Sequence, residues 1–448
     1  MTRTVAATHA LAAYACSVKA ADLPAPVVHE ARRAMVNWAG CAVGASAHPT
    51  TENAWRALRA YAGREQATLL GRAERTDGLT AALINGIASH VLDFDDTHPD
   101  VFVHPSGPVA SALLALAEER HAPGEEFLAA FVAGVEVECR IARAVMPAHY
   151  EIGWHLTGTA GIFGAAAACA RLLRLDERRT AWALGLAATQ ASGLREMFGS
   201  MAKSFHPGGA ARNGLASALM AAEGFTAAES AIEGKRGFAH VLSTTVELAQ
   251  CTDGLGRRYE LLRNTYKPYA CGLVIHPSID AGVRLRAGGL VPADLERLEL
   301  VVHPMVMELT AKTTPRTGLE GKFSVFHATA AALIDGAGGE AQFSDARVND
   351  PVVVALRGRI HARADASIPL EGVRATAHLR DGKRRELSID HCLGSIERPM
   401  SDAQLDEKYR AQCEPVLGKA RSEAALAALW NFDGLPAVAA CARAAGQA

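Results

Sequence analysis

The chain has 448 residues, of which 49% are hydrophobic and 6% aromatic, and its 46 basic and 48 acidic residues leave a formal net charge of −2. This hydrophobic content excludes a disordered chain or a fibre, and at roughly 100–200 residues per domain the length predicts two or three domains. Nucleic-acid-binding domains and proteins that bind anionic membranes carry a basic excess, which is missing here. A small molecule is therefore the expected partner.

The nine cysteines are scattered through apolar segments, without a CxxC pair or a tight cluster of Cys and His. This distribution is typical of reduced cysteines in a protein core, and it argues against a zinc ribbon or an iron–sulfur cluster. No uninterrupted apolar run reaches the roughly 18–20 residues of a membrane span. We therefore expect a cytoplasmic protein that does not cross a membrane.

From about residue 11 to residue 262 the sequence is rich in Ala, Leu, Glu and Arg, and its apolar residues recur at helical spacing. The segment 126–145 is representative, because its apolar side chains fall three or four residues apart, at Phe127, Phe131, Val135, Cys139 and Ala142. Such spacing places them on one buried helix face. We predict a compact helical bundle.

The pattern changes after Tyr266. Residues 298–302 and 373–379 are predicted strands, and Asp381-Gly382 favours a tight turn that leads into a return strand. Ser401 and Gln404 form a capping-box signature, which predicts another helix. The predicted fold class is mainly α, with an all-helical domain formed by residues 1–265 and 400–448 and an α+β domain formed by residues 266–399.

The densest group of polar residues lies between residues 90 and 104. Three histidines and four aspartates occur within these fifteen residues: His90, Asp93, Asp95, Asp96, His98, Asp100 and His104. Carboxylates and imidazoles this close shift one another's pKa values and can serve as acid and base. A solvated loop is an equally good interpretation of the composition. A third is an aspartate-rich magnesium site for diphosphates, but no second acidic cluster accompanies it.

Other candidate residues occur in four further segments. His155 precedes an Ala-rich helix, whose N-terminus could bind a carboxylate, and Lys203 and Arg212 flank a glycine-containing segment that suits anions. Lys267 and His276 lie at the predicted junction of the domains, where a site between domains would form. His327 begins an apolar helix. Each residue taken alone is weak evidence, because single lysines are usually solvated and single histidines are usually packed.

Several motifs with known chemistry are absent, among them the Walker loop, GxGxxG after a strand, GxSxG and HExxH. We therefore expect a site without metal or organic cofactor.

The sequence resembles the MmgE/PrpD family, which includes 2-methylcitrate dehydratase, cis-aconitate decarboxylase and iminodisuccinate epimerase. The resemblance rests on the segment from Ala82 to Thr97, with Asn85-Gly, His90 and Asp93-Phe-Asp-Asp, and on His104-Pro-Ser-Gly, Gly153-Trp-His, Lys267-Pro-Tyr and Lys322-Phe-Ser. It implies a helical domain formed from both ends of the chain, an α+β lid domain, an active site in the cleft between them, and a homodimer.

By position, Asp93 and His104 match the family's acid–base pair, and His155 matches its second active-site histidine. Lys267 matches the lysine at the start of the lid, Arg212 stands where decarboxylases carry a lysine, and His327 falls near one of their tyrosines. Gly272 falls where decarboxylases place another histidine. The residues expected to bind substrate are Lys203, Arg212, Lys267, His276 and His327.

The resemblance and these residue types predict an enzyme that moves a proton at a carbon next to a carboxylate. A lyase acting on a small di- or tricarboxylate is the leading hypothesis, with dehydration favoured over decarboxylation, His104 oriented by Asp93, and a locally cationic pocket. An epimerase of a dicarboxylate such as iminodisuccinate is the alternative within the family. A non-catalytic helical protein that binds carboxylates is the alternative of another class.

Overall fold

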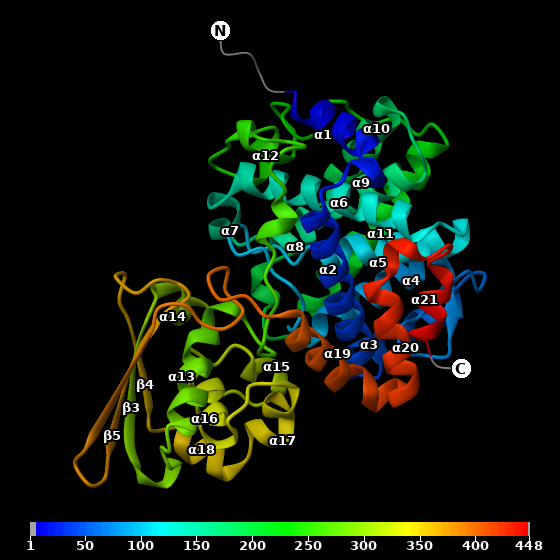
Figure 1. The fold of residues 1–448 in the computed structure, drawn as a ribbon. Helices are drawn as coiled ribbons and strands as arrows, with labels where there is room; N and C mark the ends of the chain where they lie inside the picture. Colours follow the sequence, from blue (N-terminus) through cyan, green and yellow to red (C-terminus); the bar gives the residue numbers. More distant parts are fainter. Residues whose placement is uncertain (1–5, 447–448) are drawn as a thin grey trace.

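The computed structural model describes residues 6–446 (Figure 1). It is mainly helical with one small sheet in the second half of the chain, which confirms the predicted fold class. The helices of the first half are α1 (Ala7–Ser17), α2 (Ala25–Gly44), α3 (Pro49–Leu58), α4 (Gly78–Val91), α5 (Ser106–Arg120), α6 (Gly124–Val145), α7 (Ala148–Ile152), α8 (Leu156–Thr159), α9 (Gly161–Leu172), α10 (Glu177–Ala188), α11 (Ala202–Ala222) and α12 (Phe238–Leu242). A two-stranded sheet of β1 (Ala67–Thr68) and β2 (Arg75–Thr76) lies between α3 and α4.

The helix predicted at 126–145 is α6, and its predicted apolar face is fully buried. Helix α6 packs against α9, which packs in turn against α11. The close crossing of α4 and α11 matters most for the site. A Cβ atom on Gly86 of α4 would come within 2.6 Å of the Cα atom of Gly208, and one on Gly208 within 2.5 Å of the Leu83 oxygen. The two glycines therefore let the helices touch backbone to backbone, which brings the end of α4 to the start of α11.

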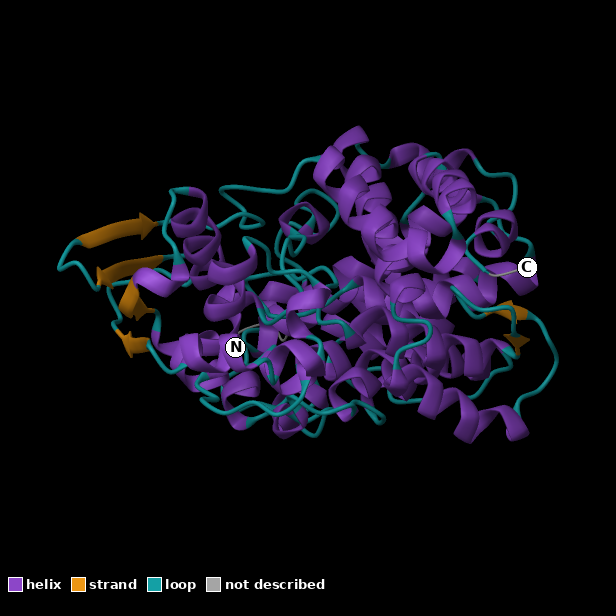
Figure 2. Cartoon of the chain, turned by 90° about the horizontal axis from the view of Figure 1, so that it is seen from below, coloured by secondary structure: helices purple, strands orange, loops and turns teal. Residues whose placement is uncertain are grey.

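The second half of the chain contains a small α+β unit. Its elements are α13 (His276–Ala287), β3 (Leu295–Val302), α14 (Pro304–Thr310), α15 (Gly318–Gly321), α16 (Val325–Asp335), α17 (Asp345–Val348), α18 (Pro351–Arg357), β4 (Ile360–Ala364), β5 (Val373–Leu379) and β6 (Arg384–Ile389). The strand order is β4-β3-β5-β6, with β3 and β4 parallel and the other pairs antiparallel. The four strands lie at the outer edge of the molecule, and α13 and α16 lie on their inner side (Figures 1 and 2).

The predicted strands and turn are present. Residues 298–302 form the end of β3, and residues 373–379 are β5. Gly382 adopts a φ of 81°, as a tight turn after β5 requires, and β6 returns antiparallel to β5. The capping box predicted at Ser401 and Gln404 is also formed, because each residue's side chain accepts a hydrogen bond from the other's backbone N–H.

The chain ends in three helices, α19 (Asp402–Leu417), α20 (Lys419–Trp430) and α21 (Ala439–Ala444). Helix α19 packs against α2 although the two are far apart in the sequence, and Figure 1 shows α2 beside α19 and α20. This arrangement is compatible with a helical domain formed from both ends of the chain. The domain limits at residues 265/266 and 399/400 remain a prediction.

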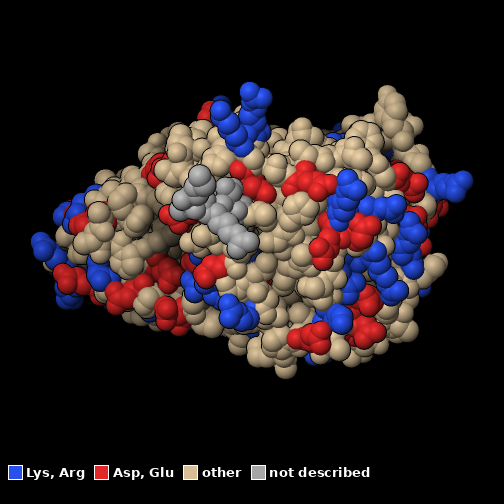
Figure 3. Space-filling model, turned by 90° about the horizontal axis from the view of Figure 1, so that it is seen from above, with Lys and Arg blue, Asp and Glu red and all other residues tan. Residues whose placement is uncertain are grey.

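None of the described helices is both long and apolar enough to span a bilayer. The cysteines are unpaired, and all but the half-buried Cys16 are buried, as predicted for core residues. Lys and Arg side chains and Asp and Glu side chains both occur across the face in Figure 3, as the balanced composition leads one to expect.

Candidate active site

Asp93 lies just beyond the end of α4, in a left-handed turn with a φ of 49°. Its buried carboxylate accepts a hydrogen bond from Lys203 Nζ on α11 through Oδ2 (2.7 Å) and one from Lys267 Nζ through Oδ1 (2.5 Å). Burial alone would raise the pKa of Asp93, but the two ammonium groups outweigh it and hold the pKa well below its usual range. Asp93 is therefore an anion that fixes two cations in place.

His104 lies in the loop between α4 and α5, and its backbone N–H donates to Thr157 Oγ1 (3.1 Å). Its Nδ1 atom is 2.8 Å from the backbone oxygen of Asp96 and 3.4 Å from Oδ1 of Asp95. Both oxygens can only accept, so Nδ1 carries the proton and Nε2 has a free lone pair. Burial, followed by the charges of Lys267 and His90, lowers the pKa of His104 well below its usual value despite Asp95. A neutral imidazole with a free Nε2 is suited to act as a base.

This geometry corrects one sequence-based expectation. Asp93 was expected to orient His104, but its two carboxylate oxygens bind Lys203 and Lys267. The orienting acceptors at His104 are Asp95 and the Asp96 carbonyl. Asp93 still lies beside His104, because a carboxylate oxygen of Asp93 and a ring nitrogen of His104 are within 4.8 Å of each other.

His155 lies at the start of α8, and its Nδ1 is 2.8 Å from Nδ1 of His206 on α11. One of these nitrogens must donate and the other accept, so the proton positions of the two rings are linked. Burial lowers the pKa of both, well below the usual value for His155 and to about 4 for His206. The rings of His155 and Phe198 also pack nearly perpendicular to each other, with centroids 5.0 Å apart. His155 is thus a second neutral imidazole at the site.

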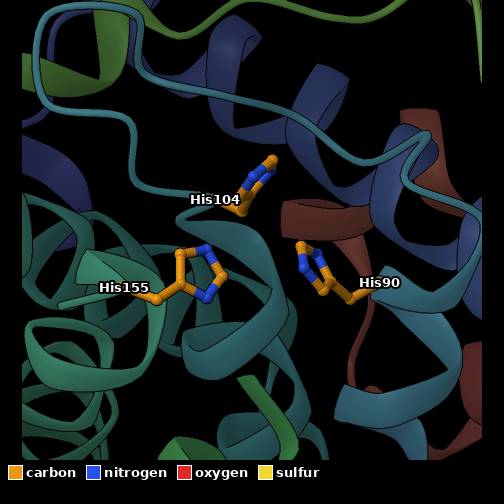
Figure 4. A group of neighbouring side chains, drawn as sticks. All are labelled: His90, His104 and His155. Atoms are coloured by element: carbon orange, nitrogen blue, oxygen red, sulfur yellow. The ribbon is translucent and has the colours of Figure 1, made fainter. Parts of the chain in front are cut away.

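The imidazole of His90 completes a group of three with His104 and His155 (Figure 4). Ring centroids are 4.7 Å apart for His90 and His104, 5.9 Å for His90 and His155, and 6.1 Å for His104 and His155. His90 Nδ1 is 2.6 Å from Oδ2 of Asp95, whereas its buried Nε2 has no hydrogen-bond partner.

Two groups among the described residues could hold a metal ion by distance: the three histidines, and Asp93 with Asp95 and His104. In each group the potential ligand atoms lie within 4.8 Å of one another. The ammonium groups of Lys203 and Lys267 argue against a metal ion here, because they already form ion pairs with the carboxylate of Asp93. Like charges this close would oppose binding of a divalent cation.

A cavity of about 60 Å³ lies beside these residues. The helical part contributes Asp93, Thr97, Phe102, His104, Tyr150, His155, Phe198 and Lys203, and the other wall consists of Lys267, Gly272, Leu273, Val274, Leu309, Thr310 and Phe323. Lys203 Nζ lies 5.3 Å from the centre of the Phe198 ring and 5.2 Å from that of Phe323. Polar groups therefore converge in a small, largely apolar space, as is typical of small-molecule sites.

The expected cationic pocket is instead an ion-paired one. The charges of Lys203 and Lys267 are matched by Asp93 and by Asp95, whose Oδ1 lies 3.8 Å from Lys267 Nζ. The two lysines differ in how many donors they use. Lys267 Nζ donates to both the carboxylate and the backbone oxygen of Asp93, whereas Lys203 Nζ donates only to the carboxylate. An ammonium group has three donors, so Lys203 has more capacity for a further anion.

Three of the predicted substrate-binding residues lie outside the lining of this cavity. Arg212 is nine residues after Lys203 on α11, which is two and a half turns and therefore the opposite face, and its Nε donates to Asn213. His276 Nε2 donates to the backbone oxygen of Cys271, and His327 Nε2 to that of Gln342. The position of these residues lends no support to a contact with substrate.

Several residues at the site were missed or given no role by the sequence reasoning. His206 follows Lys203 by one helical turn, and this spacing could have identified it. Tyr150 and Phe323 carry no local signal, because only the packing of distant segments brings them to the cavity.

The fold and the candidate active site described above are those of a family of related proteins. The chain belongs to the MmgE/PrpD family: the MmgE/PrpD N-terminal domain matches residues 9–250 and the MmgE/PrpD C-terminal domain matches residues 269–432.

Among characterised proteins, the chain is 26% identical over 433 residues to the cis-aconitate decarboxylase-like protein oryM of Aspergillus oryzae, covering 90% of each chain. It is 26% identical to the cis-aconitate decarboxylase of Aspergillus terreus, over 91% of this chain and 89% of that one. It is 25% identical to the cis-aconitate decarboxylase of Homo sapiens, over 93% and 90%. These relatives belong to a family of enzymes, and the similarity extends along nearly the whole chain.

Proposed function

We propose that the protein is a lyase of the MmgE/PrpD family that acts on a small di- or tricarboxylate by proton transfer at a carbon next to a carboxylate, without a cofactor. One observation carries the proposal: a neutral imidazole with a free Nε2, that of His104, and a buried ammonium group with unused donors, that of Lys203, line the same small cavity. The first can accept a proton, and the second can hold a carboxylate.

In the proposed reaction, Lys203 binds a substrate carboxylate, and Lys267 and Asp93 keep its ammonium group in position. His104 Nε2 removes the proton from the neighbouring carbon, and the electron pair left on that carbon spreads into the carboxylate, where the ammonium charge stabilises it. In a dehydration the C–O bond then breaks, and the departing hydroxide receives the proton that His104 has taken up, either from His104 itself or through His155, which accepts that proton and passes on one of its own, so that water leaves. In a decarboxylation no proton is removed first: the C–C bond breaks, carbon dioxide leaves, the bonding electron pair stays on the carbon, and an imidazole that has taken a proton from solvent gives it to that carbon.

The relatives named above are two cis-aconitate decarboxylases and one cis-aconitate decarboxylase-like protein, yet one cavity residue favours dehydration. Gly272 lines the cavity at the position where the family resemblance places a further histidine in decarboxylases. A site that lacks this imidazole has one proton donor fewer next to the substrate. We therefore keep dehydration ahead of decarboxylation in the proposal.

An epimerase is the second candidate, and the histidine pair favours it. The His104 and His155 rings both line the cavity with centroids 6.1 Å apart, so one could remove a proton from one face of a carbon while the other returns one to the opposite face.

The test is a turnover screen with citrate, 2-methylcitrate, cis-aconitate and iminodisuccinate, followed by NMR for new alkenes, carbon dioxide loss and inversion at carbon. An alkene identifies a hydro-lyase, carbon dioxide a decarboxylase, and inversion an epimerase. Stabilisation against heating by these acids without any turnover would refute the proposal and favour a carboxylate-binding protein. As a control, His391→Ala changes an exposed histidine of the α+β unit and should keep full activity.

We also propose that the protein forms a homodimer, on the family resemblance. Light scattering coupled to size exclusion should give twice the mass of one chain, and the mass of a single chain would refute the dimer.

A further inference from the structure

Three buried lysines donate hydrogen bonds to the backbone oxygens of three consecutive residues around Asp93. The pairs are Lys322 Nζ with Leu92 O (2.7 Å), Lys267 Nζ with Asp93 O (3.0 Å) and Lys408 Nζ with Phe94 O (2.6 Å). The lysines come from distant parts of the chain: Lys267 lies before α13, Lys322 follows α15, and Lys408 is on α19. We call Lys267, Lys322 and Lys408 the lysine triad.

The lysine triad binds backbone oxygens next to the C-terminus of α4, a location that favours cations. Residues 92–94 directly follow α4, whose last carbonyl groups have no partner within the helix and form the negative end of its dipole. Asp93 is also one of only four described residues other than glycine with a positive φ. For a residue other than glycine this backbone conformation is strained, and it persists only where the surrounding structure stabilises it. The hydrogen bonds from the three ammonium groups stabilise it here.

Lys408 does more than satisfy one carbonyl. Its ammonium group also donates to the backbone oxygen of Lys267 (2.9 Å) and to Oδ1 of Asn37 on α2 (2.7 Å). One cation thus joins the turn that carries Asp93 to the backbone of Lys267, the residue whose side chain binds that same carboxylate.

Lys322 connects the turn to the α+β unit in a similar way. Its ammonium group also donates to the backbone oxygen of Ala270 and to Oε2 of Glu340, each at 2.7 Å. Neither Lys322 nor Lys408 lines the cavity, whereas Asp93 and Lys267 do.

We propose that Lys322 and Lys408 are positioning residues, which hold the left-handed turn at Asp93 and thereby set the geometry of the Asp93–Lys267 pair. The inference rests on the proposed function, in which this pair holds Lys203 against the substrate. Lys203 keeps its charge when either residue is replaced, so a substrate carboxylate can still bind it. Its ammonium group is displaced from the place where charge develops in the reaction, so the loss should fall on kcat more than on KM.

The experiment compares Lys408→Met and Lys322→Met with the wild type. A displacement of about 1 Å at reacting groups can lower the rate about 100-fold, so we expect a fall of this order in kcat with KM changed far less. Lys408→Gln, which keeps two N–H donors at this position, serves if the Met variant does not fold, and we expect it to lose less activity.

Arg33→Met is the matched control. Arg33 is a buried cation on α2 that binds the backbone oxygen of Met400 and the carboxylate of Asp402, so it also joins α2 to the α19 region. Its side chain donates no hydrogen bond to residues 92–94. We expect it to lower the urea midpoint and leave kcat of the folded protein unchanged. A loss of kcat in Arg33→Met equal to that in Lys408→Met would overturn the inference, since attachment of α19 alone would then explain both.

Crystal structures of the two Met variants test the inference independently of turnover. We expect Asp93 to leave the left-handed conformation or its carboxylate to lose Lys203 or Lys267. An unchanged turn and ion pair in both variants would overturn the inference, even if the proposed function were correct. A displaced turn would support it, even if the protein turned over none of the carboxylates in the screen.

Discussion

Replacing Lys203 by Met should separate substrate binding from folding. The substitution removes the ammonium group whose donors are least used and keeps a similar apolar stem between Phe198 and Phe323. A hydrogen bond to a charged group contributes about 1.5–3 kcal/mol. If Lys203 makes one such bond to a substrate carboxylate, KM should rise about 10- to 150-fold, at about 1.4 kcal/mol per factor of ten.

The effect of Lys203→Met on folding should be smaller than that of Asp93→Asn. After Lys203→Met, the carboxylate of Asp93 still binds Lys267, whereas Asp93→Asn leaves two buried ammonium groups without their main partner. Breaking a buried ion pair by removing one partner costs about 3–5 kcal/mol, so Asp93→Asn should be the less stable variant.

Initial rates over a range of substrate concentrations and urea unfolding curves measure the two effects. Lys312→Met is the control, since Lys312 forms an exposed ion pair with Glu320 in the same protein and should leave both quantities unchanged. An unchanged KM in Lys203→Met would refute the role of Lys203 in binding the substrate carboxylate. Equal stability of Lys203→Met and Asp93→Asn would refute the view that Asp93 holds both lysines.

Three further predictions concern pH and metal ions. Because burial lowers the pKa of His104 well below its usual value, the fall of kcat/KM in acid should be centred below pH 6.5. A fall centred at or above pH 6.5 would contradict a neutral buried base. The pKa of Asp93 is also lowered in the folded protein, so its stabilising contribution is complete above the unfolded-state pKa of about 3.9 and is lost as the pH falls below it. Urea midpoints of Asp93→Asn and wild type should therefore converge in acid, and a constant difference down to the lowest pH would argue against the ion pair. Dialysis against EDTA should leave kcat unchanged, whereas loss of activity restored by a divalent ion would mean that the three-histidine group binds a metal.

Much of the fold could be predicted because the signals were local. The alternation in residues 373–379 and the Asp381-Gly382 turn depend only on neighbouring residues, and both appear in the structure at the predicted positions. The face of α6 was predictable for the same reason. Local periodicity therefore sufficed where each element's own residues determine its conformation.

The site was predicted less completely, because it depends on distant contacts. Lys203 meets Asp93 only because Gly86 and Gly208 let α4 and α11 touch, and no spacing in the sequence reveals that crossing. The left-handed turn at Asp93 is equally hidden, since the hydrogen bonds that stabilise it come from distant lysines. Arg212 is a different case, because its position opposite Lys203 on the helix follows from the nine-residue spacing alone.

The central claim is that His104 moves a proton at a carbon next to a carboxylate. The most direct measurement is proton NMR in D2O of each candidate di- and tricarboxylate with wild-type protein, His104→Ala and the control His391→Ala. We predict that wild type and His391→Ala exchange deuterium into one substrate or its product at that carbon, and that folded His104→Ala does not. Exchange by His104→Ala at the wild-type rate, or the absence of exchange with every acid, would contradict the account.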